Sequence, residues 1–280
     1  MSASDHAVSD SYEARIELLR TKLVELERVA VAFSGGVDSS VLLHAAHTAL
    51  GANAAGLIAD SPSLPRRELE EARVIAEQIG ARLVVLSTDE LADERYQENR
   101  GDRCYFCKSA LFRAMEPWAR EQGFRALAFG EIVDDLSDHR PGALAAREFG
   151  VVAPLSAAGL TKLDVRRYAR EHGLVVADKP ASACLASRLP VGTRVTRERL
   201  ARIEAAEESL RALGLRVLRV RDHGTIARVE VGRDELEFAN SKSPEISARV
   251  REVGFESLEL SVYQTAAERL TAAARIRISG

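Results

Sequence analysis

The sequence predicts an α/β protein with a doubly wound, mostly parallel sheet, followed by a smaller C-terminal α+β domain. Apolar runs of strand length alternate with segments of helical periodicity over the first two thirds of the chain. A glycine-rich loop at residues 34–39 joins the first such strand to a helix. Near residue 195 the pattern changes to a helix, two adjacent strands, a helix and a strand. We therefore expect two domains, residues 1–194 and 195–280.

The elements of the first domain follow from this alternation. They are a helix within 10–28, strand 29–33, a helix from 40, strand 54–59, helix 66–79, strand 82–87, a helix ending near 122, and strand 125–130. Residues 151–155, a helix at 161–172 and residues 174–176 continue the α/β pattern. Right-handed crossovers then give a parallel sheet, whose ligands bind beyond the carboxyl ends of its strands.

The second domain is predicted from a different order of elements. The expected elements are a helix ending near 213, strands 216–221 and 226–231, a helix over 234–253 interrupted near Ser243 and Pro244, and strand 258–262. Two strands that follow each other directly indicate α+β organisation instead of further crossovers.

Composition narrows the class of protein. The chain of 280 residues is 46% hydrophobic and carries a net charge of −3, as a soluble globular protein does. It has no run of roughly 20 apolar residues, and its start is neither basic nor apolar, so we expect a cytoplasmic protein without membrane association. Net acidity argues against nucleic acid as a partner bound through broad electrostatic attraction.

The loop at residues 34–39 reads Ser34, Gly35, Gly36, Val37, Asp38 and Ser39. Its glycines allow a ligand close to the backbone, and the helix that follows offers N–H groups to an anion, so the loop is a phosphate cradle. It lacks the lysine of a Walker A loop. The alternative is an ordinary turn with Asp38 and Ser39 capping the helix. Ser61 and Gly130, at the ends of two other strands, are expected in the same crevice.

Four carboxylates follow the strand at 125–130: Glu131, Asp134, Asp135 and Asp138. Carboxylates beside a triphosphate could hold Mg²⁺, or one could serve as a base. The alternative is a solvated acidic loop with Arg140 as its partner. Spacing alone does not separate these interpretations.

Three cysteines point to metal or thiol chemistry instead of a disulfide framework. Cys104 and Cys107 form Cys-x-x-Cys at the start of a helix, where the helix dipole favours thiolates. With Cys184 they resemble the ligands of an iron–sulfur cluster that has an open iron. The alternatives are a zinc site completed by His139 or His223, or one reactive Cys184 with the other two cysteines merely buried.

Basic side chains accompany the cysteines. Lys108, Lys179 and Arg188 flank them, so an anionic substrate or a departing pyrophosphate would find positive charge there. Arg219 and Arg221 share one face of a predicted strand, which is either a binding surface or a solvated face.

Two levels of resemblance follow. Residues 34–39 resemble the PP-loop of ATP pyrophosphatases, which attack the α-phosphate of ATP. With residues 103–108, 134–142, 183–188, 219–224 and 227–230, nearly the whole chain resembles the LarE family, the PP-loop sulfur transferases of nickel-pincer cofactor synthesis. The resemblance implies an adenine nucleotide alpha hydrolase-like fold, ATP and Mg²⁺ as cofactors, a pyridinium dicarboxylate mononucleotide as substrate, and a homo-oligomer.

The resemblance also assigns roles to residues. Cys184 matches the cysteine that delivers sulfur; one branch of the family sacrifices it, whereas another holds a [4Fe-4S] cluster with three cysteines, here Cys104, Cys107 and Cys184. Asp135 and Lys108 are expected at the catalytic centre. Arg188, Arg219 and Arg221 are expected to bind substrate, and Glu230 to contribute to metal binding.

Three competing functions remain at this point. A PP-loop tRNA thiolase would also use ATP and three cysteines, but a positively charged tRNA-binding face is expected of it. An amidotransferring ligase such as an NAD synthetase would leave the cysteines unexplained. A regulatory nucleotide-binding module would bind ATP and release no pyrophosphate.

Overall fold

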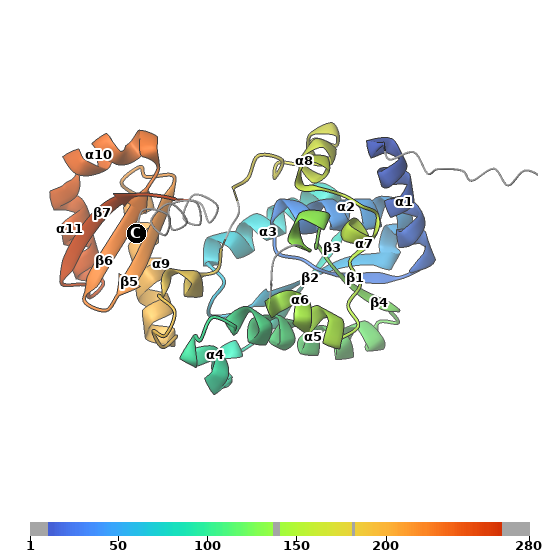
Figure 1. Cartoon of the computed structure of the whole chain (residues 1–280), viewed down its shortest axis with the longest axis horizontal. Coiled ribbons are helices and arrows are strands. Elements are labelled where there is room, and N and C mark those ends of the chain that lie inside the picture. Colours follow the sequence, from blue (N-terminus) through green and yellow to red (C-terminus); the bar gives the residue numbers. More distant parts are fainter. Residues whose placement is uncertain (1–10, 137–140, 181–182, 265–280) are drawn as a thin grey trace, which may run out of the picture. The chain divides into compact units, whose positions relative to one another are not determined.

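A four-stranded parallel sheet lies at the centre of the first unit in the computed structural model, which describes residues 11–136, 141–180 and 183–264 (Figure 1). Its strands are β1 (Val29–Ala32), β2 (Ala54–Asp60), β3 (Arg82–Ser87) and β4 (Ala126–Phe129), in the order β3-β2-β1-β4. β1 pairs with β2 and β4, so Val29 aligns with both Ala54 and Ala126. Every residue of β1 is buried, which explains its uninterrupted apolar sequence.

Helices cover both faces of this sheet. Val29, Val31 and Phe33 belong to one apolar cluster, whereas Ala30 and Ala32 belong to another. The first cluster is completed by α1 (Tyr12–Glu25), α2 (Val37–Leu50), α3 (Arg66–Ile79) and α8 (Lys162–Glu171), and the second by α5 (Arg103–Glu121) and α6 (Pro141–Glu148). Figure 1 shows the two helical layers on either side of the strands. The predicted doubly wound α/β fold is confirmed.

Shorter elements connect the strands and helices. They include 3₁₀ turns η2 (Glu90–Ala92) and η3 (Val133–Asp135), and helices α4 (Glu94–Glu98) and α7 (Pro154–Ala157). The structure differs from the prediction at residues 151–155 and 174–176. Within 151–155 only Val152 forms a bridge, to Ala128, because Pro154 begins α7. The described residues at 174–176 form no strand; the N–H of Ala177 turns back to the Leu174 carbonyl group.

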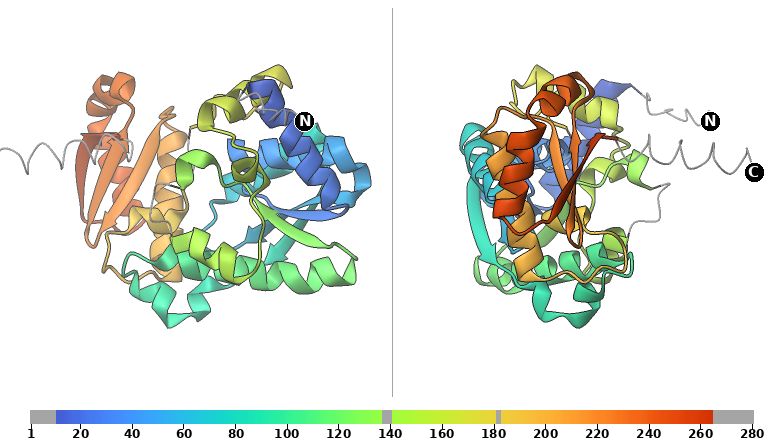
Figure 2. Two further views of the ribbon diagram at one scale, coloured as in Figure 1. Left: turned by 45° about the vertical axis from the view of Figure 1, so that its right-hand side comes forward. Right: turned by 90° about the vertical axis from the view of Figure 1, so that its left-hand side faces the viewer.

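The second unit is a three-stranded sheet with helices on one face (Figure 2). It consists of η4 (Leu185–Arg188), α9 (Arg197–Arg211), β5 (Leu218–His223), β6 (Ile226–Val231), η5 (Arg233–Glu235), α10 (Leu236–Ser241), α11 (Ser243–Glu252) and β7 (Ser257–Val262). β6 pairs antiparallel with β5 and parallel with β7, as an α+β unit allows. Pro244 in the first turn of α11 accounts for the interruption expected there.

The core of this unit takes alternate residues of its strands. Leu218 and Val220 of β5 and Val229 of β6 pack with residues from all three helices. Arg219, Arg221 and Glu230 therefore lie on the opposite face.

The two units divide between residues 183 and 184, earlier than the boundary expected after residue 194. The reason is local: η4 packs against α9 and β5, so the segment after Cys184 belongs with the second unit. No helix within the described ranges is long and apolar enough to cross a membrane.

Candidate functional site

The PP-loop, residues 34–39, turns directly from β1 into α2. Gly35 has φ +67°, and a Cβ there would lie 3.1 Å from the Ala72 Cβ of α3, so glycine is required at this position. Gly36 is the N-cap residue of α2, and no side chain in the described part of the protein forms a cap hydrogen bond there. The predicted alternative, a turn capped by Asp38 and Ser39, is wrong because both residues lie inside the first helical turn. The helix therefore begins at the loop with its positive dipole end uncapped by any side chain.

Two hydroxyl groups fix the shape of the PP-loop. The Ser34 and Ser39 hydroxyl oxygens lie 3.1 Å apart, and Ser39 Oγ accepts the Ser34 N–H at 3.2 Å. Ser39 Oγ also lies 3.1 Å from the Gly36 carbonyl oxygen, to which it can donate. Ser39 thus closes the loop on itself from within the helix.

A cleft of about 340 Å³ opens beside the PP-loop. It is lined by Ser34, Gly36, Asp38, Ser39, Cys104, Lys108, Gly130, Glu131 and Asp135, among others. The cleft thus brings together nine residues that the sequence analysis named as candidates, although they come from three separate segments of the chain. We call it the PP-loop cleft.

Other predicted nucleotide-binding residues lie outside the lining. Val37 is 6% exposed and belongs to the core, and Gly35 packs against α3. Ser61 is 7% exposed, and its carbonyl oxygen accepts a hydrogen bond from Arg66 at 2.9 Å. Gly35 and Val37 thus anchor the loop to the interior, whereas Ser61 lies buried directly after β2.

Gly130 allows β4 to end against the start of α2. A Cβ at this position would lie 2.8 Å from the Ser39 nitrogen and 3.0 Å from the Asp38 carbonyl carbon. Both atoms belong to the backbone, so they cannot move aside as a flexible side chain would. Glycine here is what brings the acidic loop after β4 to the PP-loop cleft.

Lys162 is a residue that the sequence analysis missed. Its ammonium group lies 2.7 Å from each carboxylate oxygen of Asp38. Its backbone N–H donates to Asp134 at 2.9 Å, so one residue of α8 holds both the PP-loop and the acidic loop. Lys162 and Asp38 lie 124 positions apart, and no local pattern in the sequence connects them.

The carboxylates of the acidic loop, residues 131–136, have two roles: one binds the backbone of α8, and the others line the PP-loop cleft. Asp134 accepts the Lys162 N–H, which makes it a cap of α8. Asp135 accepts the Ile132 N–H at 3.2 Å and also lines the PP-loop cleft beside Glu131. Oxygen ligands of this kind suit Mg²⁺. Asp138, His139 and Arg140 lie outside the described residues.

Lys108 extends from α5 into the PP-loop cleft, next to the cysteines. Burial lowers its pKa, and the neighbouring thiols of Cys107 and Cys104 act in the opposite direction. Cys104 is exposed and lines the cleft, whereas Cys107, one turn later, is half-buried. A cation and a thiol thus lie at the same edge of the cleft.

Lys179 does not offer a spare charge to a substrate as expected. Its ammonium group lies 2.8 Å from Glu68 and 2.9 Å from Glu71, and it donates to the Gly35 carbonyl oxygen at 3.2 Å. Burial alone would lower its pKa, but the hydrogen bonds to Glu68 and Glu71 raise it overall. Lys179 is a support that ties the PP-loop to α3.

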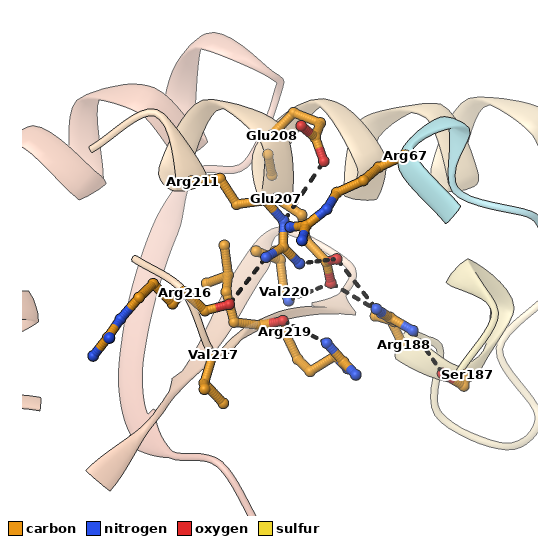
Figure 3. Close-up of polar contacts among 12 residues, drawn as sticks. Arg67, Ser187, Arg188, Glu207, Glu208, Arg211, Arg216, Val217, Arg219 and Val220 are labelled. Carbon is orange, nitrogen blue, oxygen red and sulfur yellow. Dashed lines mark hydrogen bonds and ion pairs between the residues drawn. The ribbon is translucent and has the colours of Figure 1, made fainter. Parts of the chain in front are cut away.

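In the second unit, Cys184 is anchored through its backbone. Its carbonyl oxygen accepts hydrogen bonds from the Ser187 N–H at 3.0 Å, the Ser187 hydroxyl at 2.7 Å and Arg188 at 2.9 Å. Arg188 is 3% exposed and holds both carboxylate oxygens of Glu207, at 2.9 and 3.2 Å (Figure 3). Glu207 also accepts the Val220 N–H at 3.0 Å. This network connects the cysteine to α9 and β5.

A cavity of about 550 Å³ adjoins this network. Its charged lining includes Arg188, Arg221, His223, Arg228, Glu230 and Glu259. Arg221 binds one oxygen of Glu230 at 2.5 Å, while the other, Glu230 Oε2, is buried and has no hydrogen-bond partner within residues 11–136, 141–180 and 183–264. That oxygen is an acceptor suited to a metal ion or a ligand donor.

Arg219 lies on the same strand face but does not line this cavity within the described chain. It donates to the Leu218 carbonyl oxygen at 2.9 Å and lies 5.5 Å from the centroid of the Tyr263 ring. Burial lowers its pKa, and the positive charge of Arg188 lowers it further. Arg219 therefore carries a poorly solvated charge that an anion would stabilise.

The three cysteines are divided between the two units. Cys104 and Cys107 lie in the first unit and Cys184 at the start of the second, and no disulfide joins them. Within the described parts of each unit, no three His, Cys, Asp or Glu side chains form a ready-made metal site. Three thiols nevertheless have the donor chemistry that an iron–sulfur cluster requires.

Comparison with known proteins gives relatives over nearly the full length, although no protein-family model matches the chain. It is 40% identical over 257 residues to an uncharacterised protein of Synechocystis sp., covering 90% of this chain and 96% of that one. It is 34% identical over 241 residues to the pyridinium-3,5-bisthiocarboxylic acid mononucleotide synthase of Lactiplantibacillus plantarum, covering 86% and 87%. A glutamine-hydrolysing GMP synthase of Chlamydia muridarum is 37% identical over only 75 residues, which are 27% of this chain and 15% of that one.

Proposed function

Because this chain belongs to the LarE family of PP-loop sulfur transferases, we propose that it is an ATP-dependent enzyme that converts a carboxylate of a pyridinium dicarboxylate mononucleotide into a thiocarboxylate. The name of the Lactiplantibacillus relative describes a product of this kind. The observation that carries the ATP-dependent step is the PP-loop cleft, where a phosphate cradle, Lys108 and Asp135 lie together.

In the first step, a substrate carboxylate oxygen attacks the α-phosphorus of ATP. The bond from the α-phosphorus to the bridging oxygen breaks, pyrophosphate leaves with the electron pair, and an acyl adenylate forms. The PP-loop N–H groups and Lys108 would bind the negative charge that develops. Asp135, with Glu131, would hold Mg²⁺, which supplies charge neutralisation at the phosphates.

In the second step, sulfur replaces AMP. The Cys184 thiolate attacks the acyl carbon, AMP leaves with the electron pair, and a thioester forms. Transfer of the Cys184 Cα proton to a base, with cleavage of its Cβ–S bond, would release the thiocarboxylate and leave dehydroalanine. Alternatively, Cys104, Cys107 and Cys184 would hold a [4Fe-4S] cluster, which would supply an exchangeable sulfide and allow repeated turnover.

The second unit would bind the anionic substrate. Arg221 lines its cavity, Arg188 holds the segment of Cys184 in place, and Arg219 carries a buried positive charge nearby in the sequence. Glu230 would use its unpaired oxygen for a metal ion. Because a single carboxylate oxygen is a poor site alone, a homo-oligomer that brings several copies together would complete it.

The test measures both products separately. With ATP, Mg²⁺ and the dicarboxylate mononucleotide, the wild-type protein should release pyrophosphate and produce a molecule in which sulfur replaces one oxygen, detected by mass spectrometry. Cys184→Ala should keep substrate-dependent pyrophosphate release and lose sulfur transfer. The proposal would be overturned if pyrophosphate release did not depend on the carboxylate substrate.

The route of the sulfur is tested on protein purified without oxygen. Iron and acid-labile sulfide that disappear in Cys104→Ser, Cys107→Ser and Cys184→Ser would support the cluster. Absence of iron, with Cys184 losing the mass of its sulfur after one turnover, would support sacrifice of the cysteine.

A further inference from the structure

A second cavity in the first unit has buried polar groups that the proposed function does not use. Its volume of about 420 Å³ is typical of small-molecule sites, which occupy about 300–1,000 Å³. It is bounded by η2, α4 and the side of α5 that carries Tyr105, Phe106 and Ser109. It shares no lining residue with the PP-loop cleft.

Glu90 gives this cavity an unsatisfied acceptor. The residue is 2% exposed, and its buried Oε1 has no hydrogen-bond partner among the residues that the structure describes. Ser109, 6% exposed, also lines the cavity, and its hydroxyl group lies beside Tyr105. A buried acceptor without a donor destabilises the fold because it has lost its hydrogen bonds to water, and the effect is larger when the acceptor is charged. A ligand that supplies N–H donors would remove this destabilisation.

The rest of the lining combines aromatic surface with charged groups of both signs, namely the carboxylates of Asp89, Asp93 and Glu94 and the guanidinium groups of Arg95 and Arg113. Tyr105, Phe106 and Phe149 supply the aromatic surface. Arg95 is already engaged, because it binds Asp93 at 2.7 Å and lies over the Phe106 ring. Arg113 is exposed, and no carboxylate of the described residues lies within ion-pair distance of it. Hydrogen bonds from Arg95 lower the pKa of Asp93, and the charge of Arg113 adds to this effect from a distance, so Arg113 keeps its own donors for an anion.

We propose that this cavity binds a free α-amino acid with an apolar side chain. The ammonium group would donate to Glu90 and Ser109, the carboxylate would pair with Arg113, and the side chain would pack on the aromatic surface. A metal ion does not fit, since no three His, Cys, Asp or Glu side chains of the described chain converge there. The proposal is independent of sulfur transfer.

Isothermal titration calorimetry on the full-length protein tests the two charges one at a time. The probes are L-phenylalanine, L-methionine, phenethylamine and 3-phenylpropanoate. Either amino acid should bind, phenethylamine about tenfold more weakly than L-phenylalanine, and 3-phenylpropanoate weakest, because it lacks the donor for Glu90. Glu90→Gln should weaken binding of the amino acids by about tenfold or more. Arg113→Gln should weaken the binding of L-phenylalanine and leave the affinity for phenethylamine, which has no carboxylate, unchanged.

Controls separate binding from folding and from ATP. Glu98→Gln on α4 removes a carboxylate that pairs with Arg100 and does not line the cavity, so affinity should not change. Glu90→Gln removes a buried charge, and its melting temperature should equal or exceed that of the wild type. The proposal is overturned if neither amino acid binds, if Glu90→Gln binds as wild type, or if ATP competes with the amino acid.

Discussion

At the scale of single residues, Lys179 and its two glutamates show how the PP-loop depends on charge away from the cleft. Burial alone would raise the pKa of Glu71, but hydrogen bonds from Lys179 and Arg67 lower it below its ordinary value of 4.5. A carboxylate with a lowered pKa stabilises the fold above its unfolded pKa, and this contribution disappears as the pH falls through the folded pKa.

We therefore expect Glu71→Gln to lower the free energy of unfolding by about 1 kcal/mol at neutral pH. The difference from wild type should shrink as the pH falls below 4.5 and disappear below the folded pKa of Glu71, where both proteins carry a neutral side chain at this position. Urea denaturation over a series of pH values from neutral to acid measures this. Glu70→Gln, which alters an exposed residue with its partner Arg73 at 3.6 Å, is the control and should not change the free energy of unfolding at any of these pH values. A difference that persisted in acid would contradict the role of the charge.

Lys162 leads to a second prediction at this scale. Without its ammonium group, the Asp38 carboxylate would face the phosphates of ATP unneutralised. Lys162→Gln should raise the KM for ATP about tenfold, as expected for loss of one nearby opposite charge, and Lys162→Arg should restore most of it. Lys242→Gln, which breaks an exposed ion pair with Glu245 in the second unit, is the matched control. An unchanged KM in Lys162→Gln would refute the neutralising role.

At the scale of elements, two glycines beside α2 should respond differently to a methyl group. Gly130→Ala would push Cβ into the backbone of Asp38 and Ser39, so we expect a loss of about 1–3 kcal/mol in unfolding free energy. Gly36 has φ −83°, and a Cβ added there would have its closest contact with Ser34 Oγ at 3.4 Å, so the fold should tolerate Gly36→Ala. Its methyl group lies at the PP-loop cleft, however, and should weaken ATP binding. Equal stabilities of the two variants would show that Gly130 is not needed for packing.

Helices and strands could be predicted from the sequence where the hydrophobic periodicity and the residues that end an element, such as glycine, indicate the same boundaries. α3 and β3 begin and end at the predicted residues because Gly80 ends the helix in a left-handed conformation and β3 follows immediately. Leu174 and Val176 alternate with exposed Val175 as a strand would, yet a turn also buries two apolar residues around an exposed one. Burial pattern alone does not distinguish these conformations.

The sequence predicts the PP-loop itself, but it does not predict the ion pairs that hold the loop in place. The glycines and serines of the PP-loop have a local signature, whereas Lys162 reaches Asp38 only through the packing of α8 against α2. Lys179 was assigned a charge for the substrate because its sequence neighbourhood does not show Glu68 and Glu71. Long-range ion pairs of this kind depend on tertiary structure.

At the scale of the whole molecule, each unit has its own apolar core, and the PP-loop cleft belongs entirely to the first. We expect two transitions in calorimetry, of which only one shifts when ATP and Mg²⁺ are added. A ligand at 100 times its Kd stabilises its unit by about 2.7 kcal/mol. An equal shift of both transitions would indicate that the units unfold together. Asp38→Asn, which breaks the ion pair with Lys162, identifies the transition of the first unit because it should move that one alone.

The anchoring of Cys184 has a consequence for the lifetime of the molecule. Three hydrogen bonds hold the carbonyl oxygen of this residue, and none of them involves its sulfur. A chain that had given up the sulfur would keep the three hydrogen bonds to this carbonyl oxygen and the ion pair of Arg188 with Glu207, so we expect it to stay folded. Proteases that recognise opened chains would treat spent and intact copies alike. Spent protein would therefore accumulate beside active protein, and abundance alone would not report how much capacity a cell retains.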